Sequence, residues 1–325
     1  MPDILVETRD LSKYYPVPRK KLFEKQKFVK AVEHLNLSIP KGCTYGLVGE
    51  SGCGKSTTGQ MLADIYPATD GSVLYDGKDI AKLEKTEKKQ VRQKIQMIFQ
   101  DPYSSLNPKK KIGWILEEPL KTNTNMAKDE RHSLVMEILE TVGLDESYAD
   151  KYPSQLSGGQ RQRVSIAAAL ILDPEFVIAD EAVSALDVSV QAQILNLLKD
   201  LQKSRNLTYL FISHDLQVVQ FMSDYIGVMY LGNLVETGTT DEICNNAMHP
   251  YTIALLSAVP DIQSSGKKRI VLDGEVPSPV DTPSGCPFHT RCKSATEKCR
   301  LEKPSLRRVA DGHSVSCHYA GGEEK

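Results

Sequence analysis

Residues 49–56 carry the residue types of a phosphate-binding loop. They read GESGCGKS, which fits the pattern G-x-x-x-x-G-K-[ST] between an apolar strand and a helix. Glycines let backbone N–H groups turn inward around an anion, and the following helix adds its N-terminus. We expect Lys55 to reach the β- and γ-phosphates of a nucleotide and the Ser56 hydroxyl to bind Mg²⁺. The remaining residues expected to contact the nucleotide here are Gly49, Ser51, Gly52, Cys53, Gly54 and Thr57.

Two acidic residues end the apolar run FVIADE at residues 176–181. A carboxylate at the carboxyl end of a buried parallel strand lies at the ligand crevice of an open α/β sheet. We expect Asp180 to hold Mg²⁺ through its water shell and Glu181 to orient or deprotonate an attacking water. Taken alone, the run could simply be a strand that ends on polar residues. Together with the phosphate loop it predicts hydrolysis of a nucleoside triphosphate.

A second anion-binding helix start is predicted at residues 156–160, which read LSGGQ. Serine and glycine at the start of a helix present backbone N–H groups to an anion. This segment resembles the signature motif of the ABC (ATP-binding cassette) family. The resemblance implies that the nucleotide is ATP and that two subunits pack head to tail. Each ATP would lie between the phosphate loop of one subunit and the signature of the other, formed by Ser157, Gly158, Gly159 and Gln160.

Other positions match the order of motifs in the same family. Gln100 looks like the glutamine that binds and senses Mg²⁺ and water, and His214, in the segment ISHD, looks like the histidine that touches the γ-phosphate. The resemblance therefore implies that Glu181, His214 and Gln100 carry catalysis. Tyr15 aligns with the aromatic residue that stacks on adenine, with Tyr14 as the alternative.

Residues 100–108, 249–260 and 285–318 are similar to segments of the ATPases of oligopeptide and dipeptide importers. They include QDPYSSLNP, HPYT and GCPFHTRC. The resemblance implies two transmembrane permease subunits, a substrate-binding protein and a second ATPase subunit that is usually non-identical. Related importers carry nickel or metal chelates, and the ATPase does not touch the cargo. The sequence therefore leaves peptide and chelated metal open as cargo.

Four of the seven cysteines lie in the C-terminal tail, at Cys286, Cys292, Cys299 and Cys317. No pair has the C-x-x-C spacing, so a zinc ribbon fits poorly. Four thiolates can complete the coordination of a four-iron four-sulfur cluster, and some relatives similar in this tail hold one. The alternatives are zinc bound by cysteines with His289, His313 or His318, or four free thiols.

Charge and composition argue against other classes of protein. Lys plus Arg number 40 and Asp plus Glu 42, a net charge of −2, which gives no general attraction to nucleic acid. We therefore expect no nucleic-acid partner, unlike ABC proteins of DNA repair or translation.

No apolar run approaches the roughly 18 residues of a spanning helix, and the start does not resemble a signal peptide. We expect a peripheral subunit on the cytoplasmic face of the membrane. A redox-responsive regulatory module built on the cysteine tail is the third alternative.

These residues require a particular α/β fold to position them. We predict a P-loop ABC cassette with a mixed sheet core, an inserted helical subdomain and a small cysteine-rich C-terminal appendage. Residues 176–179 and 208–212 are apolar without alternation, which is typical of parallel strands buried on both faces, and residues 226–236 predict a hairpin. The predicted boundaries are 1–100 and 157–240 for the ATP-binding core, 101–156 for the helical subdomain and 241–325 for the importer-type extension.

Two segments are predicted to be irregular. Residues 16–30 form a basic insert with two prolines, which indicates a solvated loop; the alternative is a surface that faces membrane headgroups or a partner. Residues 261–285 are rich in Pro, Ser and Gly, as is typical of a linker.

Overall fold

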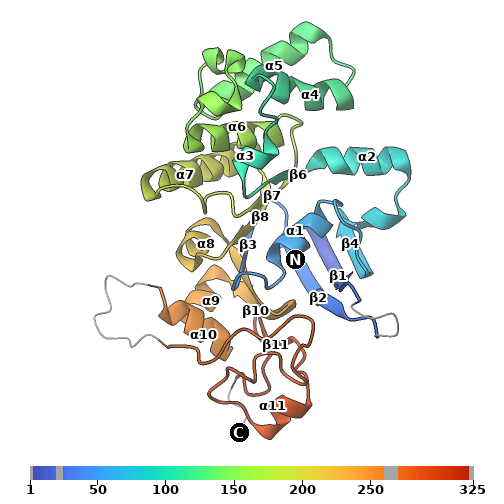
Figure 1. Cartoon of the computed structure of the whole chain (residues 1–325), viewed down its shortest axis with the longest axis vertical. Helices are drawn as coiled ribbons and strands as arrows, with labels where there is room; N and C mark the ends of the chain where they lie inside the picture. Colours follow the sequence, from blue (N-terminus) through green and yellow to red (C-terminus); the bar gives the residue numbers. More distant parts are fainter. Residues whose placement is uncertain (1–2, 20–24, 260–269, 322–325) are drawn as a thin grey trace. The chain divides into compact units, whose positions relative to one another are not determined.

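The computed structural model of the chain describes residues 3–19, 25–259 and 270–321 (Figure 1). Within them the chain forms two compact units. The first contains residues 3, 40–43 and 82–212, and the second contains residues 4–39, 44–81 and the described residues from 213 onward. Parts of the predicted basic loop and of the predicted linker lie outside the described residues.

The first unit is built on three parallel strands, two of them apolar and buried along their whole length and the third, at the edge, buried only at its two isoleucines. In β7 all five residues are buried, as are all six in β8. β7 pairs in parallel with both β6 and β8. The predicted strands at 176–179 and 208–212 are therefore confirmed. The bounds are β6 (Ile95–Ile98), β7 (Phe176–Asp180) and β8 (Thr208–Ser213), with the helices α6 (Gly158–Leu170) and α7 (Val188–Arg205).

Between β6 and α6 the chain is helical. α4 buries Ile112, Leu116 and Leu120, one residue every four, and Figure 1 shows α4 beside α5 in green. This spacing places the apolar side chains on one face of the helix, which packs on its neighbours. The predicted inserted helical subdomain is confirmed as a feature of the fold. The helices of this region and of the preceding segment are α2 (Lys85–Lys94), α3 (Pro102–Ser105), α4 (Ile112–Asn123) and α5 (Lys128–Thr141), followed by the 3₁₀ turns η2 (Glu146–Asp150) and η3 (Pro153–Gln155).

The second unit contains a mixed sheet. β3 pairs in parallel with β9, whereas β9 with β10, β10 with β12 and β12 with β11 are antiparallel. The predicted hairpin is β9 and β10, and the tail adds β12 and β11 to its free edge, which the sequence did not predict. The bounds are β3 (Thr44–Val48), β9 (Tyr225–Tyr230), β10 (Asn233–Thr239), β11 (Arg307–Ala310) and β12 (His313–Val315).

A smaller sheet in the same unit has the order β2-β1-β4-β5. The Val17 N–H donates to the Lys27 carbonyl (2.9 Å) beyond the ends of β1 and β2. The irregular segment is therefore shorter than the predicted loop over 16–30, because backbone pairing continues through residues whose composition does not indicate a strand. The bounds are β1 (Ile4–Pro16), β2 (Phe28–Pro40), β4 (Asp70–Tyr75) and β5 (Lys78–Asp79), with the 3₁₀ turn η1 (Ile80–Lys82) after them.

A buried carboxylate joins the tail to the sheet of the second unit. The Glu236 side chain is fully buried and accepts hydrogen bonds from the backbone N–H groups of Met248 (2.7 Å) and His249 (3.1 Å) and from His313 Nε2 (2.8 Å). It therefore connects β10, the start of α10 and β12. The helices of this unit are α1 (Lys55–Leu62), α8 (Leu216–Met222), α9 (Thr240–Asn245), α10 (Pro250–Ser257) and α11 (Glu297–Leu301).

Among the helices in the described parts of the chain, none is long and apolar enough to cross a bilayer.

His249 makes folding stability depend on pH. Its Nδ1 accepts the Tyr251 N–H (3.1 Å), which requires a neutral ring, and burial lowers its pKa from 6.5 to about 3. Below pH 6.5 the unfolded chain binds a proton that the folded chain excludes. The contribution of His249 is therefore complete above pH 6.5 and is lost as pH falls towards 3, by up to about 1.4 kcal/mol per pH unit.

We expect His249→Asn, which keeps a side-chain acceptor at the start of α10, to show a shallower loss of stability between pH 7 and pH 5. Urea unfolding of both proteins across this range measures the free energy of unfolding. Equal slopes would show that His249 does not titrate as its burial requires.

Candidate nucleotide-binding site

The predicted phosphate loop joins β3 to α1, as the sequence indicated. Lys55 is buried, and its Nζ donates to the carbonyl oxygens of Gly49 (2.8 Å) and Glu50 (3.1 Å). The Cys53 N–H donates to the Glu50 carbonyl (3.2 Å), which closes the turn. The loop therefore curls around the ammonium group and holds it at the start of α1.

Two glycines permit this curl. At Gly54 φ is +107°, and a Cβ there would lie 2.1 Å from the Ala31 carbonyl oxygen. A Cβ at Gly49 would lie 2.2 Å from the Met229 carbonyl oxygen. Both positions press the loop against neighbouring strands, so any larger residue would displace its backbone.

The rest of the predicted loop lies around the first turn of α1. Ser51 and Gly52 are exposed, whereas Ser56 and Thr57 are half-buried at the helix start. The first N–H groups of a helix have no acceptor within the helix, so this end is suited to bind an anion.

Two further predicted residues belong to the same unit. Tyr15 is the second-last residue of β1 and is half-buried, and Lys13 Nζ lies 5.2 Å from the centre of its ring. His214 is exposed between β8 and α8, and the next residue, Asp215, caps α8 by accepting the Gln217 N–H (2.9 Å).

In the first unit the structure brings Gln100 and Glu181 together. Gln100 Nε2 donates to Glu181 Oε2 at 2.7 Å, and Asp180 is buried as the last residue of β7. The two residues follow neighbouring parallel strands, whose carboxyl ends lie at one edge of the sheet. The predicted magnesium ligand and the predicted base thus occupy consecutive positions at that edge.

Glu181 has a strained backbone. Its φ is +47°, in the left-handed region, and its N–H donates to the Ile212 carbonyl (2.9 Å) on the neighbouring strand. A non-glycine residue in this region costs about 1–3 kcal/mol, and such residues gather at functional sites. The strain turns the chain sharply after β7 and gives Glu181 a direction different from that of a regular strand residue.

The predicted signature forms the start of α6. Ser157 caps the helix by accepting the Gln160 N–H (3.3 Å), and Gln160 Oε1 accepts the Ser157 N–H in return (3.0 Å). A Cβ at Gly159 would lie 2.5 Å from Val190 Cγ1, so α6 approaches α7 closely at this point. No acidic residue lies in the first turn of α6. The helix start is therefore suited to bind an anion.

The residues predicted for nucleotide chemistry are divided between the two units. The phosphate loop, Tyr15 and His214 belong to the second unit. The first unit contains Gln100, Asp180, Glu181 and the signature. Their roles in nucleotide chemistry stay predictions.

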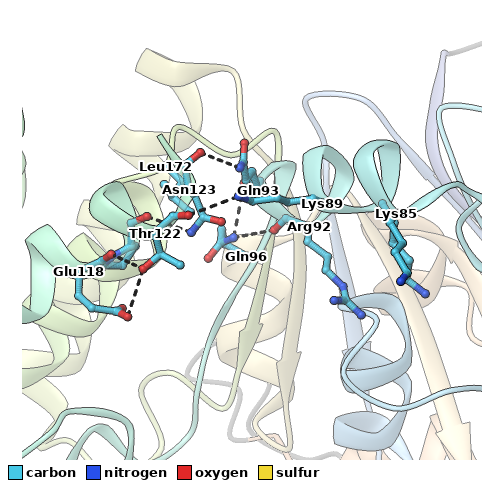
Figure 2. Close-up of a pocket in the computed structure, with 11 residues that line it drawn as sticks. Lys85, Lys89, Arg92, Gln93, Gln96, Glu118, Thr122, Asn123 and Leu172 are labelled. Atoms are coloured by element: carbon cyan, nitrogen blue, oxygen red, sulfur yellow. Dashed lines mark hydrogen bonds between the residues drawn. The ribbon is translucent and has the colours of Figure 1, made fainter. Parts of the chain in front are cut away.

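The first unit also contains a basic groove of about 540 Å³ (Figure 2). Lys85, Lys89 and Arg92 line it from α2, and Gln93 Nε2 donates to the Asn123 carbonyl of α4 at 3.2 Å. None of the predicted site residues lines it.

The four tail cysteines line a single cavity of about 150 Å³ in the second unit. Burial, together with the smaller effect of the nearby Cys299, Cys317 and Cys292, raises the pKa of Cys286 to about 11. His249, His289 and His318 line the same cavity. Burial and the nearby Cys299 also raise the pKa of Cys317.

The positions of the candidate metal ligands can be compared with those that a metal site requires. Within the described parts of the chain, no three His, Cys, Asp or Glu side chains are placed to hold one metal ion. His313, considered as a zinc ligand, is fully buried and contacts Glu236 instead of the cavity. His289 Nδ1 and His318 Nε2 lie within hydrogen-bonding distance of the carbonyls of Cys286 (2.9 Å) and Glu302 (3.0 Å).

Sequence reasoning missed the residues that contact the phosphate loop from the tail. The Tyr251 hydroxyl accepts the Glu50 N–H (2.9 Å), and Arg291 donates to both carboxylate oxygens of Glu50 (2.7 and 3.1 Å). These partners lie 201 and 241 positions from Glu50. No local spacing could have identified them.

Comparison with known proteins identifies two family regions in the chain. Residues 32–184 match the ABC transporter family, and residues 235–299 match the C-terminal region of oligopeptide/dipeptide transporters.

Relatives match nearly the whole chain. It is 50% identical over 321 residues to the oligopeptide transport ATP-binding protein AppF of Bacillus subtilis, covering 97% of each chain. It is 48% identical to the dipeptide transport ATP-binding protein DppF of Escherichia coli, covering 98% of this chain and 96% of the relative. A solved structure of the ATP-binding cassette MJ0796, a dimer bound to ADP and Pi, is 30% identical with a TM-score of 0.63, covering 73% of this chain and 99% of that one. The predicted ABC cassette fold is therefore confirmed.

Proposed function

This chain belongs to the family of ATP-binding proteins of oligopeptide and dipeptide ABC transporters, and on that premise we propose how its residues carry out ATP hydrolysis. It is the ATPase subunit that energises peptide import by coupling ATP hydrolysis to transport. The observation that carries the proposal is the loop curled around Lys55, whose carbonyl oxygens hold the ammonium group at the start of α1. Backbone N–H groups of such a loop and the N-terminus of the following helix are suited to bind phosphate.

Binding of ATP is assigned to the second unit. The loop N–H groups and the start of α1 would surround the phosphates, and Lys55 would exchange its loop carbonyls for the β- and γ-phosphate oxygens. Ser56 would ligate Mg²⁺, and Tyr15 would stack on adenine. Mg²⁺ supplies charge neutralisation of the phosphates when bound.

Hydrolysis is assigned to Glu181 with help from its neighbours. Water attacks the γ-phosphorus, the bond from that phosphorus to the bridging oxygen breaks, and Glu181 accepts the proton that water loses. Gln100, already hydrogen-bonded to Glu181, would orient the water and contact Mg²⁺, together with Asp180. His214 would contact the γ-phosphate.

Assembly follows from the start of α6. We propose a head-to-tail ATPase dimer in which the signature of this chain meets ATP on the loop of a partner ATPase. The dimeric state of the MJ0796 structure supports this arrangement. Two transmembrane permease subunits, a second and non-identical ATPase subunit and a substrate-binding protein complete the proposed importer. The chain would be peripheral on the cytoplasmic face of the membrane.

The cargo proposed is peptide and not a nickel or metal chelate. The relatives reported above are named for oligopeptide and dipeptide transport. The C-terminal region also matches the oligopeptide/dipeptide transporter description.

The domain boundaries remain proposals as well: residues 1–100 and 157–240 for the ATP-binding core, 101–156 for the helical subdomain and 241–325 for the importer-type extension.

The cysteine cavity is proposed to hold a four-iron four-sulfur cluster through Cys286, Cys292, Cys299 and Cys317. The support is that all four cysteines line one cavity and that a four-iron four-sulfur cluster takes four cysteine ligands. Nothing in ATP hydrolysis needs an electron. A bound cluster would supply folding energy to a small tail with few apolar residues.

The first test concerns the proposed base. Glu181→Gln keeps the shape of the side chain but cannot accept the proton, so ATP binding should persist while hydrolysis falls about 10²–10⁴-fold. Lys55→Ala should instead weaken ATP binding itself. Nucleotide affinity and steady-state phosphate release separate the two effects. Hydrolysis by Glu181→Gln at the wild-type rate would exclude Glu181 as the base.

A second test concerns the signature. Ser157→Arg places a bulky cation at the start of α6, so it should block hydrolysis at the site completed by the partner's loop. ATP binding to the loop of the mutant chain should be unchanged. Ser133→Arg, on the exposed face of α5, is the matched control. The arrangement in trans is wrong if Ser157→Arg weakens ATP binding at its own loop as strongly as it slows hydrolysis.

A third test concerns the cavity. Chain purified without oxygen should contain iron and sulfide in equal amounts, about four of each, with broad visible absorption. Cys299→Ser should lose both, whereas Cys244→Ser, outside the cavity, should retain them. Stoichiometric zinc with neither iron nor sulfide would rule out the cluster.

A further inference from the structure

Glu50 is a carboxylate inside the loop proposed to bind ATP. It occupies the second position of GESGCGKS, and its carbonyl oxygen accepts from Lys55 Nζ at 3.1 Å. The side chain is only 27% exposed. A negative charge near the triphosphate weakens nucleotide binding by repulsion unless a cation neutralises it.

Arg291 supplies that cation from the far end of the sequence. Its two terminal nitrogens donate to the two carboxylate oxygens of Glu50 at 2.7 and 3.1 Å, and its side chain is 7% exposed. Such a bidentate pair neutralises the carboxylate and fixes its direction. The hydrogen bond to Glu50 raises the pKa of Arg291, so the guanidinium stays charged.

A second tail contact holds the backbone of the same residue. The Tyr251 hydroxyl accepts the Glu50 N–H at 2.9 Å. The Tyr251 ring packs on Tyr230 and Phe288, with ring centres 4.8 and 5.4 Å apart. Phe288 and Arg291 lie on one short turn, in which the Arg291 N–H donates to the Phe288 carbonyl (3.0 Å). The turn therefore supports both the aromatic contacts and the ion pair.

We propose that Arg291 is a positioning residue for ATP binding, which acts by neutralising Glu50 and holding it in the curled loop. The tail segment that contains it is then part of the nucleotide site, although it lies outside the loop motif. This inference rests on the proposed function, because it requires the loop to bind ATP.

The experiment distinguishes the effect of the Arg291 charge on Glu50 from a merely structural role of Arg291 in the tail. Arg291→Met should weaken Mg-ATP binding about tenfold, since the unpaired carboxylate then repels the phosphates. Adding Glu50→Gln to this variant removes the repulsion and should restore affinity to within about threefold of wild type. Arg300→Met, which removes an exposed cation from the same tail, is the matched control and should bind ATP as wild type does.

Affinity is measured by calorimetric titration of the full chain with Mg-ATP, and thermal unfolding without nucleotide is measured in parallel. If Arg291→Met does not fold, Arg291→Gln replaces it, because it keeps a hydrogen-bond donor but loses the charge. It should bind ATP more weakly than wild type and recover with Glu50→Gln. Wild-type affinity in the Arg291 variant, or a loss that Glu50→Gln does not restore, overturns the inference. Failure of wild type and Arg300→Met to bind ATP overturns the proposed function instead.

Discussion

The curl of the phosphate loop around Lys55 is the constraint on which the second unit depends. An ammonium group is buried only when its hydrogen bonds are satisfied, and here the loop's own carbonyls accept them. This requires the backbone to lie against the Ala31 and Met229 carbonyls, where only glycine fits. Strands β2 and β9 must therefore flank the loop, and each is held in place by a different sheet of the second unit.

The first unit depends on a different constraint. There the important feature is the direction of one side chain, because Glu181 leaves β7 through a left-handed backbone conformation and meets Gln100. Parallel pairing of β6 with β7 brings the two strand ends to one edge. The buried strand β7 is paired with β8 as far as Asp180, the residue before Glu181. This pairing holds the backbone that precedes Glu181 and so sustains its strained conformation.

The tail is part of the second unit's core and not merely an appended segment. Glu236 receives hydrogen bonds from the start of α10 and from β12, and Phe288 packs among Tyr230, Tyr251 and His249. The turn that carries Phe288 and Arg291 also carries Cys286 and Cys292 at its ends. A change in the cysteine cavity and a change in the phosphate loop would therefore act on the same few residues.

The sequence by itself determined the features that depend on local order. The loop motif, the apolar strands ending in acids and the helix start at LSGGQ each follow from neighbouring residues, so the α/β fold and the residues proposed for ATP were predictable. Only the tertiary structure decided the contacts of Glu50, because hydrogen bonds to Tyr251 and Arg291 span about two hundred residues or more. It also decided the pairing of β12 with β10 and the burial of His313 against Glu236, since a strand edge and a buried partner leave no pattern within a short segment of sequence.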